Sequence, residues 1–164
     1  MKIQYILVRT DLPSLQTEKG GKGMAHATHA GNAMVHHIVT SGDPLLIQAL
    51  ADWGAETGQG FGTCVTLGAT GDQINAIMEQ TRRECVELHE KGVISMAGTS
   101  VDPTYPYVVD SEVVKLIDKR FHSAEPKKLD DGTYLCQRSE MTAAFLFGEK
   151  DEIGHLVSHL KRHP

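Results

Sequence analysis

The sequence predicts a layered α/β fold, because short apolar strands alternate along the chain with longer amphipathic helices. The chain has 164 residues, enough for one domain with a core of its own. Hydrophobic residues make up 40% of it and charged residues 23%, which excludes disorder and collagen-like repeats. We therefore expect a single domain over residues 1–164 with a mostly covered sheet.

The first half of the chain is predicted to hold two strands and two helices. Ile3–Arg9 is a short β-branched run typical of a buried strand. The loop Asp11–Gly21 follows, and helical periodicity then extends over Lys22–Thr40. A second helix is expected over Pro44–Trp53, because proline suits the first helical position. A glycine-rich stretch then leads into a strand over Thr63–Leu67.

The second half is predicted to hold three strands and three helices. The strands are expected over Ile94–Ala97, Tyr107–Val109 and Met141–Phe147. The helices are expected over Gly71–Lys91, Glu112–Phe121 and Asp151–Arg162. The turn-rich Gly98–Pro106 and the polar His122–Arg138 are expected to connect them.

Several classes of protein are excluded by composition. No apolar run approaches the roughly 18–20 residues that cross a bilayer, so we expect no membrane partner. Cys64, Cys85 and Cys136 are far apart and form no CxxC pair, which favours a reduced, cytoplasmic protein over a disulfide framework. The formal net charge of −5 argues mildly against a broad nucleic-acid surface.

The first helix carries the most informative pattern. On a helical wheel its small and apolar residues share one broad side, which we expect to pack on the sheet. That side holds Met24, Ala27, Ala30, Gly31, Met34, Val35 and Ile38. The opposite side holds Lys22, His26, His29, Ala33 and His36. A lysine and two histidines therefore share one face of the first two turns.

This face combines groups suited to anion binding and proton transfer. Gly21 and Gly23 flank Lys22, so a ligand can approach the backbone near a helix N-terminus that favours anions. Histidine exchanges protons near neutral pH. Alternatively, the glycines form only a flexible loop and the histidines lie on an ordinary surface. Zinc is disfavoured, because His26 and His29 have no nearby Asp, Glu or Cys to complete a ligand set.

The segment Gly21–Ala30 resembles the first-helix motif of the archaeal/eukaryotic-type (type 2) peptidyl-tRNA hydrolases, Gly-Lys-x-Ala-Ala-Gln-x-Ser-His-Ala. Gly21, Lys22, Ala25, His29 and Ala30 match in register, and Thr28 replaces serine. Other segments are similar to family segments in the same order. They are Val8–Leu12, Trp53 with Gly58-Gln59, Pro103–Tyr105, Val108–Asp110, Thr142–Gly148 and Glu152–Lys161.

The resemblance implies a compact α/β domain with a four-stranded mixed sheet, often dimeric. It implies metal-independent hydrolysis, without a cofactor, of the ester that joins a peptide to the terminal ribose of tRNA. Carried over by position, the catalytic residues are Lys22, His29 and Asp110. The positions of His26 and Thr28, with the flanking glycines, contact substrate. Peptidyl-tRNA or a related RNA is then the partner.

The roles of these residues follow from ester chemistry. His29 is the candidate base, oriented by Asp110. Lys22 either stabilises the oxyanion or binds a tRNA phosphate. Asp110 has an alternative role as the N-cap of the following helix, since aspartate is a good capping residue.

Two departures from the family pattern favour a second hypothesis, a non-catalytic relative that binds RNA, a nucleotide or a protein partner, whereas the retained Lys22, His29 and Asp110 favour the hydrolase. His26 stands where the family has glutamine. The family's Asp-Ala-Gly-x-Thr segment here spans Asp110 to Val114, so its glycine and its threonine hydroxyl are missing. An insertion is expected at about residues 115–139. Its lysines, with Lys22, are the basic groups available to contact phosphates.

Overall fold

The computed structural model describes residues 1–12, 21–90, 95–110 and 126–163. They fall into two compact units. Unit 1 comprises Met1–Ser100 and Ala143–Pro164, and unit 2 comprises Val101–Thr142. The prediction of one domain over residues 1–164 stays a prediction.

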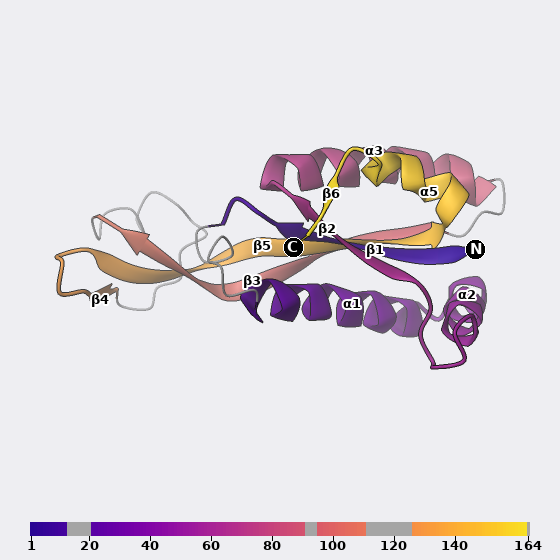
Figure 1. The fold of residues 1–164 in the computed structure, drawn as a ribbon, viewed down its shortest axis with the longest axis horizontal. Coiled ribbons are helices and arrows are strands. Elements are labelled where there is room, and N and C mark those ends of the chain that lie inside the picture. Colours follow the sequence, from indigo (N-terminus) through magenta and orange to yellow (C-terminus); the bar gives the residue numbers. More distant parts are fainter. Residues whose placement is uncertain (13–20, 91–94, 111–125, 164) are drawn as a thin grey trace. The chain divides into compact units, whose positions relative to one another are not determined.

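The described residues form a mixed α/β structure with four helices and a six-stranded sheet (Figure 1). The strands are β1 (Lys2–Arg9), β2 (Cys64–Ala69), β3 (Ser95–Val109), β4 (Lys127–Lys128), β5 (Tyr134–Glu149) and β6 (Lys161–Arg162). The helices are α1 (Gly21–Ser41), α2 (Pro44–Ala55), α3 (Gly71–Glu90) and α5 (Lys150–Val157). The predicted α/β class and mixed sheet are confirmed. The expected count of four strands is wrong, because β4 and β6 have only two residues each, too few to show a sequence pattern.

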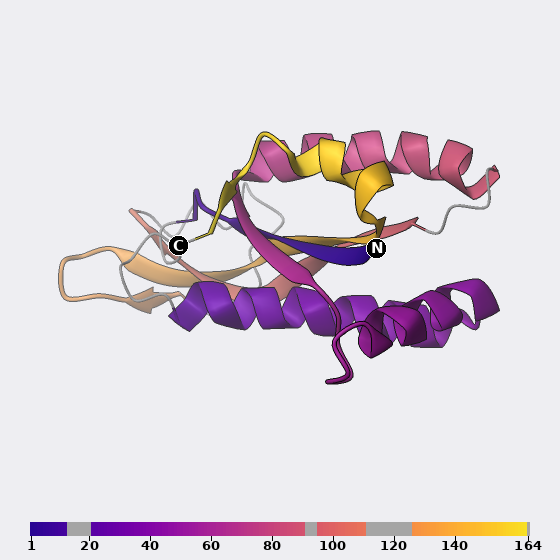
Figure 2. The same ribbon diagram turned by 45° about the vertical axis from the view of Figure 1, so that its right-hand side comes forward.

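The sheet has the order β3-β5-β1-β2-β6, and β4 pairs with β5 outside this path. β1 runs parallel to β2, with Leu7 opposite Leu67, and antiparallel to β5. In unit 1, α1 and α2 lie against one face of the sheet, and α3 and α5 lie against the other (Figures 1 and 2). β1 is therefore covered on both faces, which explains its continuous apolar sequence.

The core between α1 and the sheet is formed by small residues at one end and aromatic residues at the other. Near the start of α1, Ala30 packs against Ile6 and Val8 of β1. Further along, the core residues are Met34, Ile38, Ala49, Trp53, Phe145 and Phe147. The small residues let the helix approach the strands closely, and the aromatic residues bury most of the apolar surface.

The expected packing face of α1 was wrong in part. Met24 is 73% exposed and Val35 is 40% exposed, whereas His26, which was expected on the outer face, is buried at 7%. The helix is rich in alanine, glycine and histidine, so its own hydrophobic pattern defines the buried side weakly. The contacts of Met34 and Ile38 with the large aromatic residues set its rotation instead.

α2 begins at Pro44 as predicted and ends at Ala55, two residues later than expected. Asp43 caps the helix by accepting hydrogen bonds from the backbone N–H groups of Leu45 and Leu46. At the other end, the Trp53 indole N–H donates to the Thr63 carbonyl at 3.0 Å. Gly62 is required there, because a Cβ would lie 2.3 Å from the Trp53 carbonyl oxygen.

Two elements of the second half differ from the prediction. Gly98–Pro106 was expected to be a turn, but β3 runs through it without a break. Glycine and proline are tolerated because β3 lies at the end of the strand order, where an edge strand leaves part of its hydrogen bonding unpaired. The last helix was expected to reach Arg162, but α5 ends at Val157 and the chain then forms β6 on β2.

Unit 2 contains a hairpin within the predicted polar connection. β4 pairs with the start of β5, with Lys127 opposite Leu135. The turn between them uses Gly132, whose φ of +87° is a left-handed conformation that favours glycine. Asp131 accepts hydrogen bonds from the backbone N–H and the hydroxyl of Thr133, which fixes the turn.

Some predictions lie outside the described residues. They include most of the loop before α1, the predicted helix Glu112–Phe121 and the first part of the expected insertion. Within the described part of the chain, no helix is long and apolar enough to cross a membrane.

Candidate functional site

The start of α1 carries most of the predicted site residues. Gly21 is the first residue of the helix. Lys22 and His29 are exposed, and they lie seven residues apart. At 1.5 Å per residue this separation is about 10 Å along the axis, or two turns. A lysine side chain is long enough to approach a ligand that also contacts His29.

His26 is buried beneath the exposed His29 and contacts its ring. The two imidazole rings meet edge to face, with centroids 5.9 Å apart. His26 is buried, so its ring forms part of the surface against which His29 rests. A substrate can therefore reach His29 directly, whereas direct contact with His26, as the resemblance implies, would be limited to its small exposed fraction.

Thr28 and Gly23 have structural partners of their own. The Thr28 hydroxyl donates to the Met24 carbonyl at 2.9 Å, so it turns back onto the helix although the residue is exposed. Gly23 is buried, and a Cβ at this position would lie 3.0 Å from Cε1 of His163. The C-terminal segment therefore packs directly against the first turn of α1.

Asp110 follows β3 in unit 2 and is exposed, whereas Lys22 and His29 belong to unit 1. The pairing of Asp110 with His29 therefore stays a prediction. Its alternative role as a helix cap concerns residues 112–121, which lie outside the described residues.

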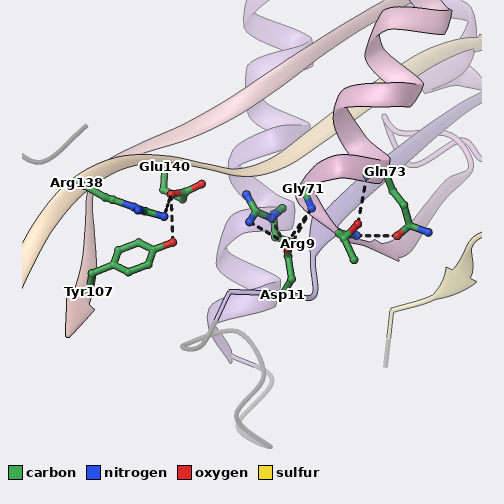
Figure 3. Close-up of polar contacts among 8 residues, drawn as sticks. Arg9, Asp11, Gly71, Gln73, Tyr107, Arg138 and Glu140 are labelled. Atoms are coloured by element: carbon green, nitrogen blue, oxygen red, sulfur yellow. Dashed lines mark hydrogen bonds and ion pairs between the residues drawn. The ribbon is translucent and has the colours of Figure 1, made fainter. Parts of the chain in front are cut away.

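A polar group at the carboxyl ends of β1 and β2 was not predicted (Figure 3). Asp11 accepts two hydrogen bonds from the Arg9 guanidinium, at 2.5 and 3.1 Å, and one from the Gly71 backbone N–H at 3.2 Å. Partial burial alone would raise the pKa of the Asp11 carboxyl. The bonds from Arg9 and Gly71 outweigh this effect, so the pKa lies below its usual value.

The start of α3 lies at the same edge of the sheet, and two reciprocal hydrogen bonds between Thr70 and Gln73 cap it. The Thr70 hydroxyl accepts from the Gln73 N–H at 3.2 Å, and the Gln73 side chain accepts from the Thr70 N–H at 2.8 Å. This is a capping box, which the sequence Thr-x-x-Gln could have revealed. Because Asp11 also accepts from the Gly71 N–H, the backbone N–H groups of Gly71 and Gln73 in the first turn of α3 both have hydrogen-bond partners.

Unit 2 has its own buried charged group (Figure 3). Arg138 binds Glu140 at 2.5 Å and stacks on the Tyr107 ring, 3.6 Å from its centroid. The Tyr107 hydroxyl donates to Glu140 at 3.2 Å. Burial and the Glu140 charge raise the pKa of Tyr107. Because Arg138 neutralises Glu140, this group suits a structural role, and only the Arg-x-Glu spacing within β5 marks it in the sequence.

No protein-family model matches the chain, and no curated protein matches it at a significant level. Among the described residues, no three His, Cys, Asp or Glu side chains gather in a way that would hold a metal ion. The assignment of a function therefore depends on the chemistry of the α1 face and on the sequence resemblance.

Proposed function

We propose that this protein hydrolyses the ester bond of peptidyl-tRNA, with the first two turns of α1 as its catalytic site. The observation that carries the proposal is the pair formed by Lys22 and His29, both exposed and two turns apart on one helix. The resemblance of Gly21–Ala30 to the type 2 peptidyl-tRNA hydrolases supplies the substrate class.

His29 acts as the general base. Its imidazole takes a proton from a water molecule, whose oxygen attacks the carbonyl carbon of the ester. The bond between this carbon and the ribose oxygen then breaks, and the imidazolium returns the proton to the ribose oxygen. Contact with the buried His26 ring limits the orientations of His29, which favours a fixed approach to the water.

Lys22 supplies positive charge at the start of the helix. It acts on the oxyanion that develops during attack or on a phosphate of the bound tRNA. The two roles give different kinetics. Loss of oxyanion stabilisation lowers kcat, whereas loss of a phosphate contact mainly raises KM. Lys22→Ala therefore distinguishes between them.

The proposal is tested by the turnover of an N-acetylaminoacyl-tRNA, a simple peptidyl-tRNA analogue. We expect His29→Ala to lower kcat by about 10²–10⁴-fold, the usual contribution of a general base. His36→Ala is the matched control, because it removes an exposed histidine from the same helix and should change kcat less than about twofold. Asp110→Asn should lower kcat if Asp110 orients His29.

Either of two results would contradict the proposal. One is that the wild-type protein fails to release the acyl group above the uncatalysed rate. The other is that His29→Ala and His36→Ala have the same effect. In the first case, binding of tRNA without turnover would favour the non-catalytic alternative.

A further inference from the structure

A concave pocket of about 410 Å³ lies within unit 1 at the carboxyl ends of the parallel strands β1 and β2. It is bounded by the first turn of α3 and by the segment that joins α5 to β6. Its lining residues are Thr10, Gly68, Gln73, His159, Leu160, Lys161 and Arg162. Ligands of α/β proteins commonly bind outside the carboxyl ends of parallel strands.

The ionisable residues that line this pocket are all basic. Three of the lining residues are basic, namely His159, Lys161 and Arg162, and none is acidic. Lys161 and Arg162 are exposed, and no ion pair involves either of them in the described part of the chain. The neighbouring Asp11 is already bound to Arg9. Asp72, which precedes the lining residue Gln73 in the first turn of α3, is a second acidic residue close to the lining in sequence.

The basic segment is held in place by backbone pairing. Lys161 lies opposite Gly68, and Arg162 lies opposite Leu67, in the antiparallel pair of β2 and β6. The His163 N–H also donates to the Thr66 carbonyl at 3.1 Å. Because the strand fixes the backbone of both cationic residues, less conformational entropy is lost when they bind an anion.

Beside the basic residues, the polar lining of the pocket comes from Thr10 and Gln73. A Cβ at Gly68 would lie 2.8 Å from Cγ2 of Thr10, so glycine lets the Thr10 methyl pack closely over β2 on this side of the pocket. The Gln73 side-chain oxygen is used in the capping box, which leaves its amide N–H groups to donate. Such donors, beside arginine and lysine, suit the oxygen atoms of a phosphate.

We propose that this pocket binds a backbone phosphate of single-stranded RNA. The pocket's chemistry supports the phosphate, while the choice of RNA rests on the proposed function. His163 connects the two, because the same C-terminal segment leaves the pocket and packs against Gly23 at the start of α1. RNA held here would therefore lie near the first turn of the helix that carries Lys22 and His29.

The test measures binding of a fluorescent single-stranded RNA to the full chain at several salt concentrations. The test variant is Lys161→Ala with Arg162→Ala. The control is Arg82→Ala with Arg83→Ala, which changes the net charge equally on the exposed side of α3. Circular dichroism verifies that both variants are folded.

We expect the test variant to bind RNA about tenfold more weakly at low salt, whereas the control stays close to wild type. Each phosphate contact on a single strand contributes about 0.7 to the slope of log affinity against log salt. Loss of this one phosphate contact should flatten the slope by about 0.7, or about two- to threefold in affinity over a fourfold rise in salt.

The proposal is overturned if the wild-type protein fails to bind RNA at low salt, or if the test and control variants bind equally. Competition with inorganic phosphate and with a mononucleotide identifies the source of the phosphate. Either of them displacing the RNA at micromolar concentration would show that the pocket takes a free anion instead. A pocket-dependent RNA affinity without ester hydrolysis would support this inference while the proposed function fails.

Discussion

Asp11 should stabilise the protein through its bonds to both β1 and α3, and Asp11→Asn isolates the contribution of its charge. The asparagine can still accept from the Gly71 N–H, but the Arg9 guanidinium, whose side chain is 11% exposed, loses its anionic partner. Hydrogen bonds to charged groups contribute about 1.5–3 kcal/mol. Because the Asp11 side chain is 38% exposed, we reduce this to about 1–2 kcal/mol.

The assay is thermal unfolding at neutral pH, followed by circular dichroism. For a chain of this length, about 1–2 kcal/mol corresponds to a fall in Tm of about 2–8 °C. Asp11→Ala should cost about 0.5–1 kcal/mol more, because it also removes the acceptor for the Gly71 N–H. Asp72→Asn, which changes an exposed carboxylate in the first turn of α3, is the control and should lower the stability less.

The pH dependence has a definite sign. The pKa of Asp11 is lowered in the folded protein, so its contribution is present above the unfolded pKa of about 3.9. It is lost as the pH falls through the lower, folded pKa. The Tm difference between wild type and Asp11→Asn should therefore shrink in acid. Equal Tm values at neutral pH, or a difference that persists in acid, would refute the reasoning.

Two further predictions concern the other packed groups. Gly98→Ala should destabilise the protein by about 1–3 kcal/mol, since a Cβ would lie 2.7 Å from Cζ of the fully buried Phe145; an unchanged midpoint of urea denaturation would contradict this. Tyr107 should deprotonate above the usual tyrosine pKa in an ultraviolet absorbance titration, because burial and Glu140 raise its pKa. The associated stability is present below the unfolded pKa and is lost as pH rises through the folded one, so ionisation of Tyr107 at its ordinary pKa would disprove the proposed environment.

The elements that the sequence predicts well have strong local causes. Asp43 and Pro44 mark the start of α2, and the uninterrupted apolar run of β1 marks a buried strand. β6 has no such local cause, because its two residues become a strand only by pairing with Leu67 and Gly68 of β2. Likewise, β3 continues past Gly98 because its partner strand, and not its own composition, sustains it.

The candidate site likewise combines features that have local causes in the sequence with features that do not. The helical spacing of Lys22 and His29 can be read from the sequence, because both residues belong to one element. The burial of His26 could not, since the aromatic residues of β5 and α2 determine the rotation of α1. His163 packs against Gly23, although the two residues lie near opposite ends of the chain. No local sequence pattern predicts such a contact.

The central claim is that His29 directs water onto the acyl carbonyl of peptidyl-tRNA. It is tested most directly by the mass of the acyl product released from N-acetylaminoacyl-tRNA in heavy-oxygen water, with His29→Ala in parallel. We predict one heavy oxygen in the released carboxylate, none in the ribose of the tRNA, and loss of this release in the variant. Heavy oxygen in the ribose, or equal release by wild type and His29→Ala, would contradict the account.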